Sequence, residues 1–540
     1  MSIVELITRL RQQNIRIWVQ DNQLAYAAPK GGFPKSLRDE LVAHKSEVIE
    51  FMTSACEDKR LKYPLTPVSR DTNLPLSSAQ QRLWLLDQTQ PDTALYNIVA
   101  AVVLNGPLDV TALHKAFAVV VERHEALRTV FPAPDGQPFQ KILPTIPVPF
   151  SLIDLSALPE LIRDMEITWQ QNAAAARPFN LATGPLVRFT VLALQPTAHA
   201  ILLTLHHIIA DGWSIKVALN EISTIYQSLA GNRSIPLPPL KIQYADFACW
   251  EEQFFEDKAL QSQLAYWRSR LADIPDTLNL PRDYRRTAST RPIGGAVPIE
   301  FSPTLTRQFT EFAQEQNSTL FMLLLAVFNV LLWRNCAQED ICIGMPIATR
   351  HMPELEHMIG LFVNTLVLRT RVTGEDTFVD LLAQVRQNTL EAYNNQDAPF
   401  DKVVKLIRSR HSSARTPLFT VAISLDNAPA ANLESAGLTL ESLPVHTSAS
   451  QFDIALYFGK SSETVNGTWV YDARLFEKKT IRSLQQEYIG IFENVLSKPN
   501  IPLSTLPLTS CTAELKNKST REKRNTTLKN KLLETAKKSV

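Results

Sequence analysis

Residues 200–214 read Ala-Ile-Leu-Leu-Thr-Leu-His-His-Ile-Ile-Ala-Asp-Gly-Trp-Ser, and the rest of the chain is best understood from this stretch. Its first six residues are apolar apart from one threonine, which is typical of a buried β-strand. A second apolar run over residues 188–194 precedes it across a short turn, so the two runs are expected to pair. Ser214 can cap a helix whose apolar positions continue to Leu229. The histidines and Asp211 are therefore expected on a turn between a buried strand and a helix, a place that commonly carries chemistry.

The residues of this turn suit proton transfer. Neighbouring histidines at a strand end point to opposite sides, so only one of His206 and His207 can readily face a cleft while the other packs inward. Asp211 is near enough to close the turn through hydrogen bonds or an ion pair, and Gly212 allows the backbone close to a ligand. An imidazole with a pKa of about 6.5 can accept a proton near neutral pH, as acyl transfer to a nucleophile requires.

From these residues alone, three interpretations of the histidine pair stay open: a packed or surface pair, acyl-transfer chemistry, and metal binding. Metal binding is the weakest, because the other histidines follow no ligand spacing and the five cysteines form no CxxC pair. We therefore expect no metal. The scattered, odd number of cysteines also disfavours a disulfide framework and fits a reducing, cytoplasmic setting.

Composition excludes several other classes of protein. The 540 residues carry 55 Lys+Arg against 54 Asp+Glu, so binding of nucleic acid by bulk electrostatics is not expected. No GxGxxG or GxxxxGK[ST] motif occurs, which disfavours a nucleotide-binding loop. The most apolar stretch, residues 320–333, is shorter than the roughly 20 residues that span a bilayer and is expected to form a buried helix. Charged residues interrupt the first dozen positions, so no secretory signal and no membrane association are expected.

The chain divides into segments of different character. Residues 1–52 show a helix, a hairpin around Asp21-Asn22 and a second helix capped at Ser36. A proline-containing linker over 53–74 follows, and mixed α/β patterning covers 75–505, with a seam at the proline-rich residues 235–239. We therefore expect lobes over 75–235 and 236–505, then a linker remnant and tail over 506–540. The last 29 residues hold nine Lys/Arg and three Glu, which indicates a solvated terminus or an interaction tail.

The turn resembles the HHxxxDG motif of the condensation domains of nonribosomal peptide synthetases, relatives of chloramphenicol acetyltransferase. Further stretches resemble other signatures of this family, in family order. They are residues 78–86 (SAQQRLWLL), 123–131 (RHEALRTVF), 244–250 (YADFACW), 359–365 (IGLFVNT) and 395–401 (NQDAPFD). Ala210 departs from a common serine, and residues 410–418 match weakly. The resemblance implies an α/β fold of two chloramphenicol-acetyltransferase-like lobes arranged as a V, with the motif where the lobes meet.

The resemblance also implies residue roles. His207 is expected to act on the attacking amine, as a base or by orienting it, while His206 belongs to the motif but supports the strand end. Asp211 is expected to pair with an arginine, with Arg123 and Arg128 as candidates, and the Gly212 N–H is expected to contact an oxyanion or amide. Asn364 is expected to line the substrate tunnel. Other signature residues are expected to hold the lobes together: Arg82, Trp84, Tyr244, Trp250, Asp397 and Phe400.

The implied reaction is amide formation between a carrier-bound acyl or peptidyl thioester and the amine of a carrier-bound aminoacyl group, with both an L-donor and an L-acceptor favoured. No cofactor is expected to be bound, since both substrates ride on phosphopantetheine arms of peptidyl carrier proteins. Residues 1–52 resemble tubulysin-type N-terminal docking domains, which receive a C-terminal peptide of an upstream synthetase. Two alternatives stay open: a stand-alone acyltransferase that uses coenzyme A or a carrier, and a catalytically silent recruiting module. With no adenylation or carrier motif, amino acids are expected to be activated elsewhere, whether the chain is free-standing or the front of a longer synthetase.

Overall fold

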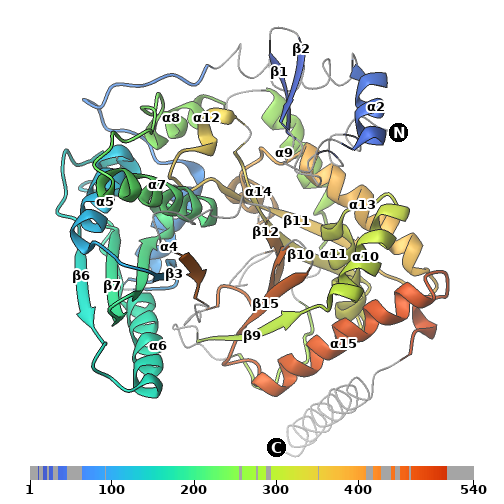
Figure 1. Ribbon diagram of the computed structural model, residues 1–540. Coiled ribbons are helices and arrows are strands. Elements are labelled where there is room, and N and C mark those ends of the chain that lie inside the picture. The colour runs from blue at the N-terminus through green and yellow to red at the C-terminus, as the bar shows by residue number, and fades with distance from the viewer. Residues whose placement is uncertain are drawn as a thin grey trace, which may run out of the picture.

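The computed structural model describes residues 6, 10, 16–20, 23–27, 34–45, 64–91, 93–254, 258–274, 278–286, 293–350, 352–408, 418–426, 439–443, 450–460 and 464–507. The basic tail and the first half of the linker, residues 53–63, lie outside these ranges. Two lobes lie side by side, and the N-terminal unit is drawn above them in Figure 1.

The N-terminal unit contains the hairpin that the sequence predicts. Strands β1 (Arg16–Gln20) and β2 (Gln23–Ala27) pair antiparallel on either side of Asp21-Asn22. Helix α2 (Lys35–Ala43) buries Leu37 and Leu41, as its apolar spacing predicts. The predicted cap at Ser36 is wrong: Pro34 takes the N-cap position, and no side chain caps the helix. Pro34 lies outside the helix with φ −53° and ψ 129°, and the helix begins at the next residue, Lys35.

The N-terminal lobe is built on a five-stranded sheet that is buried on both faces. Its order is β13-β3-β8-β7-β6, with only β6 and β7 parallel. In the central strand β8, Ile201, Leu203 and Leu205 join the cluster under α5 and α7, whereas Ala200 and Leu202 join the cluster under α6. This double burial explains why the strand is a nearly continuous apolar run. The bounds are β3 (Asn97–Asn105), β6 (Phe150–Asp154), β7 (Val187–Gln195), β8 (Ala198–His206), β13 (Thr439–Ser442), α4 (Ser78–Thr89), α5 (Val110–Arg123), η1 (Glu125–Arg128), α6 (Glu160–Ala176) and α7 (Gly212–Ala230), with a small pair β4 (Thr129–Val130) and β5 (Lys141–Ile142).

The C-terminal lobe has a six-stranded mixed sheet in the order β11-β10-β12-β14-β15-β9. In Figure 1 its helices α10, α11, α13 and α15 lie on one side of that sheet. The bounds are β9 (Gly294–Glu300), β10 (Asp340–Ala348), β11 (Val363–Arg371), β12 (Val421–Asp426), β14 (Ile454–Lys460), β15 (Val465–Asp472), α9 (Lys258–Arg270), α10 (Pro303–Glu315), α11 (Leu320–Cys336), α12 (Pro353–Glu356), α13 (Phe378–Asn394), α14 (Phe400–Arg408), α15 (Lys478–Ser497) and η3 (Leu503–Thr505).

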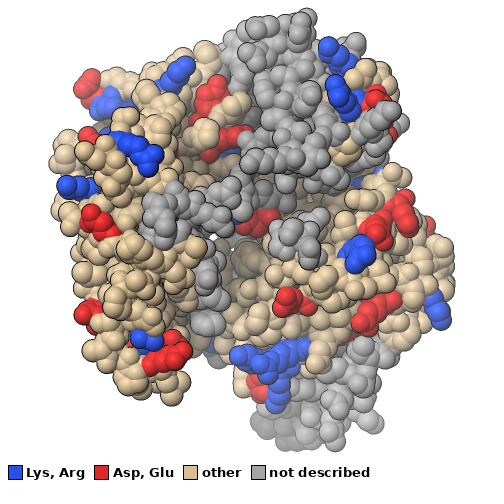
Figure 2. Space-filling model, in the orientation of Figure 1, with Lys and Arg blue, Asp and Glu red and all other residues tan. Residues whose placement is uncertain are grey.

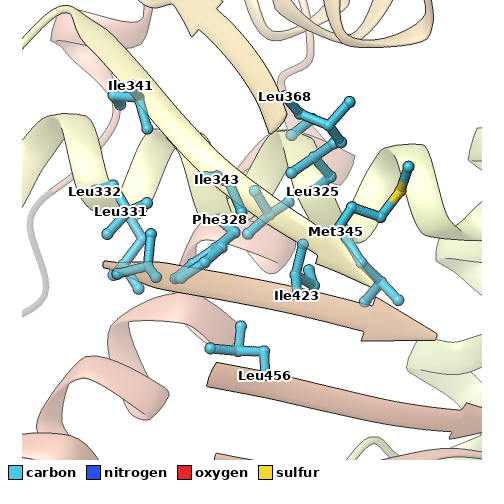
Figure 3. Packing of buried hydrophobic residues seen from close by; sticks show 14 of the residues in the cluster. Leu325, Phe328, Leu331, Leu332, Ile341, Ile343, Met345, Leu368, Ile423 and Leu456 are labelled. Carbon is cyan, nitrogen blue, oxygen red and sulfur yellow. The ribbon is translucent and has the colours of Figure 1, made fainter. Parts of the chain in front are cut away.

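Helix α11 is the buried helix that residues 320–333 predict. Figure 3 shows its Leu325, Phe328, Leu331 and Leu332 packed against β10, β11, β12 and β14. Within the described ranges no single helix is long and apolar enough to cross a membrane; α10 and α11 meet the length and composition criteria only as a pair, bent by 100°. The apolar character of α11 is therefore accounted for by its place in the core.

The two lobes exchange segments of chain. Strand β13 follows the C-terminal sheet strand β12 in sequence but pairs with β3 of the N-terminal sheet. Helix α8 (Tyr244–Phe254) packs into the N-terminal core through Tyr244 and Phe247, whereas α9 joins the C-terminal core through Leu260 and Trp267. The packing therefore moves the lobe boundary from 235/236 to the stretch between Phe247 and Leu260. The predicted seam marks a loop on the surface of one lobe, because prolines indicate a break in regular structure and not a change of core.

Candidate active site

The predicted strand–turn–helix is present around the two histidines. Strand β8 ends at His206, a short 3₁₀ turn η2 (His207–Ile209) follows, and α7 begins at Gly212. The Gln80 amide of α4 donates to the Ile208 carbonyl over 3.1 Å, which ties the turn to the first helix of the lobe. The motif is thus fixed at both ends by regular structure.

His206 packs inward and is 1% exposed. Its Nδ1 accepts a hydrogen bond from the Ile208 N–H at 3.2 Å, and its ring meets Tyr96 and Phe179 edge-on. Burial, with a smaller contribution from His207, lowers the pKa of His206 to about 3. His206 therefore stays neutral and holds the strand end, and it has no surface with which to touch a substrate.

His207 is the partly exposed member of the pair. Its backbone N–H donates to the Tyr96 carbonyl at 2.8 Å, and its carbonyl accepts from the Ala210 N–H, so the chain around it is held on both sides. Burial lowers the pKa of the His207 imidazole, Asp211 opposes this shift, and the cation of Arg82 adds to it. The ring is consequently neutral at neutral pH and able to accept a proton.

Asp211 is the centre of a buried polar network. Its Oδ1 accepts from the Ser214 N–H and hydroxyl at 2.8 and 2.7 Å, and its Oδ2 accepts from the Phe362 N–H at 3.0 Å. Asp211, not Ser214 as the sequence indicated, is the N-cap of α7. Its ion pair is with Arg350, Nη2 to Oδ1 at 3.1 Å, and both side chains are at most 2% exposed. Arg350 also donates to the Met358 carbonyl at 2.6 Å and to the Leu355 carbonyl.

The predicted partners of Asp211 are therefore wrong. Arg123 at the end of α5 pairs instead with Glu221 of α7 at 3.1 Å, and the Arg128 guanidinium donates to the Leu143 carbonyl at 2.7 Å. Neither arginine contacts Asp211. Arg350 follows strand β10 of the other lobe and is 139 positions from Asp211 in sequence. No periodicity or spacing marks such a pairing, so sequence reasoning had no signal for it.

The Asn364 amide is fully occupied by backbone groups. Its Nδ2 donates to the Gln396 and Ala398 carbonyls at 2.8 and 2.9 Å, and its Oδ1 accepts from the Thr365 and Phe400 N–H groups at 2.9 and 3.0 Å. A side-chain amide offers two donors and two acceptor positions, and all four are used. Asn364 therefore braces the loop before α14, and its place in the substrate tunnel stays a prediction.

Gly212 is exposed at the first position of α7. A Cβ there would meet nothing within 4 Å. The N–H groups of a first helical turn lack helical partners; Asp211 accepts from that of Ser214, which leaves those of Gly212 and Trp213 available to a negatively charged oxygen. Its oxyanion contact stays a prediction.

Groups from both lobes surround the turn. The Arg82 guanidinium of α4 lies 4.9 Å from the centre of the Phe400 ring of α14, and Lys216 of α7 pairs with Asp426 of β12 at 2.7 Å. The Tyr244 hydroxyl donates to the Leu361 carbonyl at 2.7 Å. Figure 2 shows the surface hollowed at its centre, between the two lobes. His207 thus lies at the seam between the lobes, within a frame of buried contacts.

Within the described residues, no group of three or more His, Cys, Asp or Glu side chains is arranged to hold a metal ion. The chemistry available at the seam is that of a neutral imidazole, a helix N-terminus and nearby hydroxyl and backbone groups. Such a set can move a proton and stabilise a developing oxyanion.

The chain thus has a mixed α/β fold of two lobes, in which a buried Asp–Arg pair holds the turn after the two histidines, and comparison with known families gives the family. The condensation domain profile matches residues 70–515, and the TubC N-terminal docking domain profile matches residues 3–53. The chain belongs to the condensation domain family of nonribosomal peptide synthetases.

Relatives and solved structures agree with this assignment. A linear gramicidin synthase of Brevibacillus parabrevis is 40% identical over 446 residues, 82% of this chain and 9% of that protein. Phosphinothricin tripeptide synthetase PhsC of Streptomyces viridochromogenes is 36% identical over 439 residues, 81% of this chain and 40% of that protein. The chain thus spans less than half of either relative.

The X-domain from teicoplanin biosynthesis superposes with a TM-score of 0.75 at 26% identity, over 82% of this chain and all of that one. The first condensation domain of the calcium-dependent antibiotic synthetase has a TM-score of 0.71 at 18% identity, over 82% and 100% of the two chains, and supports the fold alone.

Proposed function

We propose that this chain joins a carrier-bound acyl or peptidyl thioester to the amine of a carrier-bound aminoacyl group, with release of the donor carrier's thiol. The observation that carries the proposal is His207, a neutral, partly exposed imidazole at the lobe seam, four residues before Asp211 of the buried Asp211–Arg350 pair. Membership of the condensation family supports the same reaction class.

The proposed reaction forms one C–N bond and breaks one C–S bond. The amine nitrogen attacks the thioester carbonyl, which forms the C–N bond and a tetrahedral oxyanion; collapse then breaks the C–S bond. The amine loses one proton and the departing sulfur gains one. An α-amine with a pKa of about 8 is mostly protonated at neutral pH, so a neutral imidazole that takes or directs this proton is useful. Help of this kind is worth roughly 10² to 10⁴ in rate.

The carbonyl oxygen becomes negatively charged in the tetrahedral intermediate. The first turn of α7 begins at Gly212, five residues after His207, and the backbone N–H groups of Gly212 and Trp213 precede the one that Asp211 binds. Donors already oriented toward a developing charge stabilise it without reorganisation. We assign the oxyanion to this turn, and we assign Asp211 the task of fixing the turn, since its carboxylate is used up by Ser214, Phe362 and Arg350.

The partners follow from the same proposal. The phosphopantetheine arms of a donor and an acceptor peptidyl carrier protein bring both substrates, and the chain itself binds no cofactor in this scheme. The β1–β2 hairpin offers a strand edge to which an incoming peptide of an upstream synthetase can add by backbone hydrogen bonds. An L-configured donor and an L-configured acceptor are the expected substrates.

The test is product formation between two loaded carrier proteins, followed by intact-protein mass spectrometry, for the wild type and His207→Ala. We expect amide product with the wild type and at least a hundredfold slower formation with a folded His207→Ala variant. Equal rates would remove His207 from the mechanism. Transfer from free coenzyme A thioesters without any carrier would favour a stand-alone acyltransferase, and carrier binding without product would favour a recruiting module.

A further inference from the structure

One face of the C-terminal sheet is not covered by the helices of its own lobe. Residues of β14 alternate between the two faces: Leu456 and Phe458 are buried in the cluster with α11 and α15, whereas Tyr457 between them is 41% exposed. Helices α10, α11, α13 and α15 lie on the opposite side of the sheet (Figure 1). Tyr457 therefore lies on the face that is turned away from those helices.

A row of hydroxyl groups crosses this face. Tyr457 is in register with Ser424 of β12 on one side and with Thr468 of β15 on the other. Neighbouring strands lie about 4.8 Å apart, so the row is about 10 Å long. Within the part of the chain that the structure describes, none of these three hydroxyls has a hydrogen-bond partner. The row thus presents donors and acceptors that are not used by the fold.

Tyr457 is exposed and yet closely surrounded by protein. Desolvation raises the pKa of its hydroxyl to about 12, although the residue is 41% exposed. These two facts agree if the side chain lines a hollow. Two positions further along β14, Gly459 points from the same face, and a Cβ added there would meet nothing within 4 Å. The space in front of this face is therefore open beside Tyr457.

The row is connected to the histidine turn. Asp426 lies two positions beyond Ser424 on the same face of β12 and in register with Gly459. Its carboxylate is 2.7 Å from Lys216 Nζ, in the helix that begins at Gly212. A chain held at His207 through its reacting carbonyl can thus continue along this face.

We propose that Ser424, Tyr457 and Thr468 bind the amide groups of the chain attached to the reacting thioester. The hydroxyls of such a row can donate to carbonyls and accept from amide N–H groups, which an alkyl chain does not offer. This inference rests on the proposed condensation function. The amides come either from a peptidyl donor or from the pantetheine arm, and the two sources can be separated experimentally.

The test compares Tyr457→Phe, Gly459→Leu and the wild type with two donors of matched length, a dipeptidyl and a saturated alkyl acyl group. Each donor is supplied both on a holo carrier protein and as an N-acetylcysteamine thioester. Tyr457→Phe removes one hydroxyl, so we expect kcat/KM to fall about threefold to tenfold where amides occupy the row. Gly459→Leu places a side chain in the open space, where its Cβ meets nothing within 4 Å, so we expect at least a tenfold loss. Tyr284→Phe, an exposed tyrosine bonded to Glu477 in the same lobe, is the matched control and should leave the rate unchanged.

The results with the four donors distinguish the peptidyl chain from the pantetheine arm as the source of the bound amides. A loss confined to dipeptidyl donors assigns the row to the peptidyl chain, and a loss with both carrier-bound donors but neither small thioester assigns it to the pantetheine arm. No loss with any donor overturns the inference. If the wild type forms no product at all, the proposed function fails. The inference is then tested by calorimetry, which measures the binding of a dipeptidyl-pantetheine whose thioester is replaced by an amide. Equal affinity for wild type and Tyr457→Phe would overturn it.

Discussion

Replacing Asp211 by alanine should lower the free energy of unfolding by more than the loss of one helix cap. The carboxylate accepts four hydrogen bonds, from the Ser214 N–H and hydroxyl, the Phe362 N–H and Arg350, with almost no exposure to water. Its loss leaves a buried guanidinium uncompensated, which costs about 3 to 5 kcal/mol. Loss of the N-cap of α7 adds about 1 kcal/mol. We expect a loss of about 4 to 6 kcal/mol, a large share of the roughly 5 to 15 kcal/mol that stabilises a typical domain.

The assay is urea unfolding followed by circular dichroism for wild type, Asp211→Ala, Arg350→Met and the double variant. The double-variant cycle isolates the pair, because residues in contact show a coupling energy that distant residues lack. We expect the double variant to be more stable than the sum of the two single losses predicts, since it leaves neither charge unpaired. Arg371→Ala is the control: its pair with Glu339 is exposed, and exposed pairs contribute at most about 1 kcal/mol.

Two results would refute this reasoning. A loss below about 1 kcal/mol for Asp211→Ala would mean that the buried pair does not hold the turn. Strict additivity in the cycle would mean that Asp211 and Arg350 do not stabilise one another despite their 3.1 Å contact.

Three further predictions concern neighbouring groups. Arg82→Met removes a cation that lowers the pKa of His207, so that pKa should rise and the acid limb of the kcat/KM profile should move to higher pH; a limb that stays or moves lower contradicts the assignment. Burial raises the pKa of Glu251 to about 7, so the free energy of unfolding of the wild type should fall as pH rises from about 4.5 to 7 and stay flat above that range. In thermal melts, the stability of Glu251→Gln relative to the wild type should therefore increase over that range, by up to about 3 kcal/mol. A difference that does not change with pH would argue against a buried carboxyl. Gly360→Ala places a Cβ 1.9 Å from the buried Tyr244 ring and should cost about 1 to 3 kcal/mol in urea unfolding, whereas Gly212→Ala, with open space around it, should not show this clash; equal losses would contradict the geometry.

Local patterns in the sequence were sufficient for the elements that carry the site. The apolar run before His206 and the helical spacing after Gly212 predicted β8 and α7, because burial on both faces of a strand and on one stripe of a helix leaves a direct pattern in sequence. The buried helix α11 and the β1–β2 hairpin were predicted for the same reason.

Contacts between distant segments left no such pattern. The sequence predicts that Asp211 pairs with an arginine, but it contains many arginines and does not show which one. Arg350 is identified as the partner only by the fold, which brings it next to Asp211. The amide of Asn364 braces backbone groups of residues 396–400, a set of contacts that its signature in the sequence does not predict. The lobe boundary was placed at a proline-rich loop, whereas membership of a core depends on which apolar side chains meet, as Tyr244 and Leu260 show.

Strand β13 has a consequence for how the chain is made. It completes the edge of the first sheet beside β3, yet it is encoded more than 300 positions later. At about 5 to 20 residues per second, a ribosome needs tens of seconds to add that length. Throughout that interval the backbone groups of β3 on that side have no strand beside them, and an open strand edge invites pairing with other chains. We therefore expect aggregation on nascent chains to depend on how quickly synthesis reaches residue 442, and a chain released before that point to keep the edge permanently open.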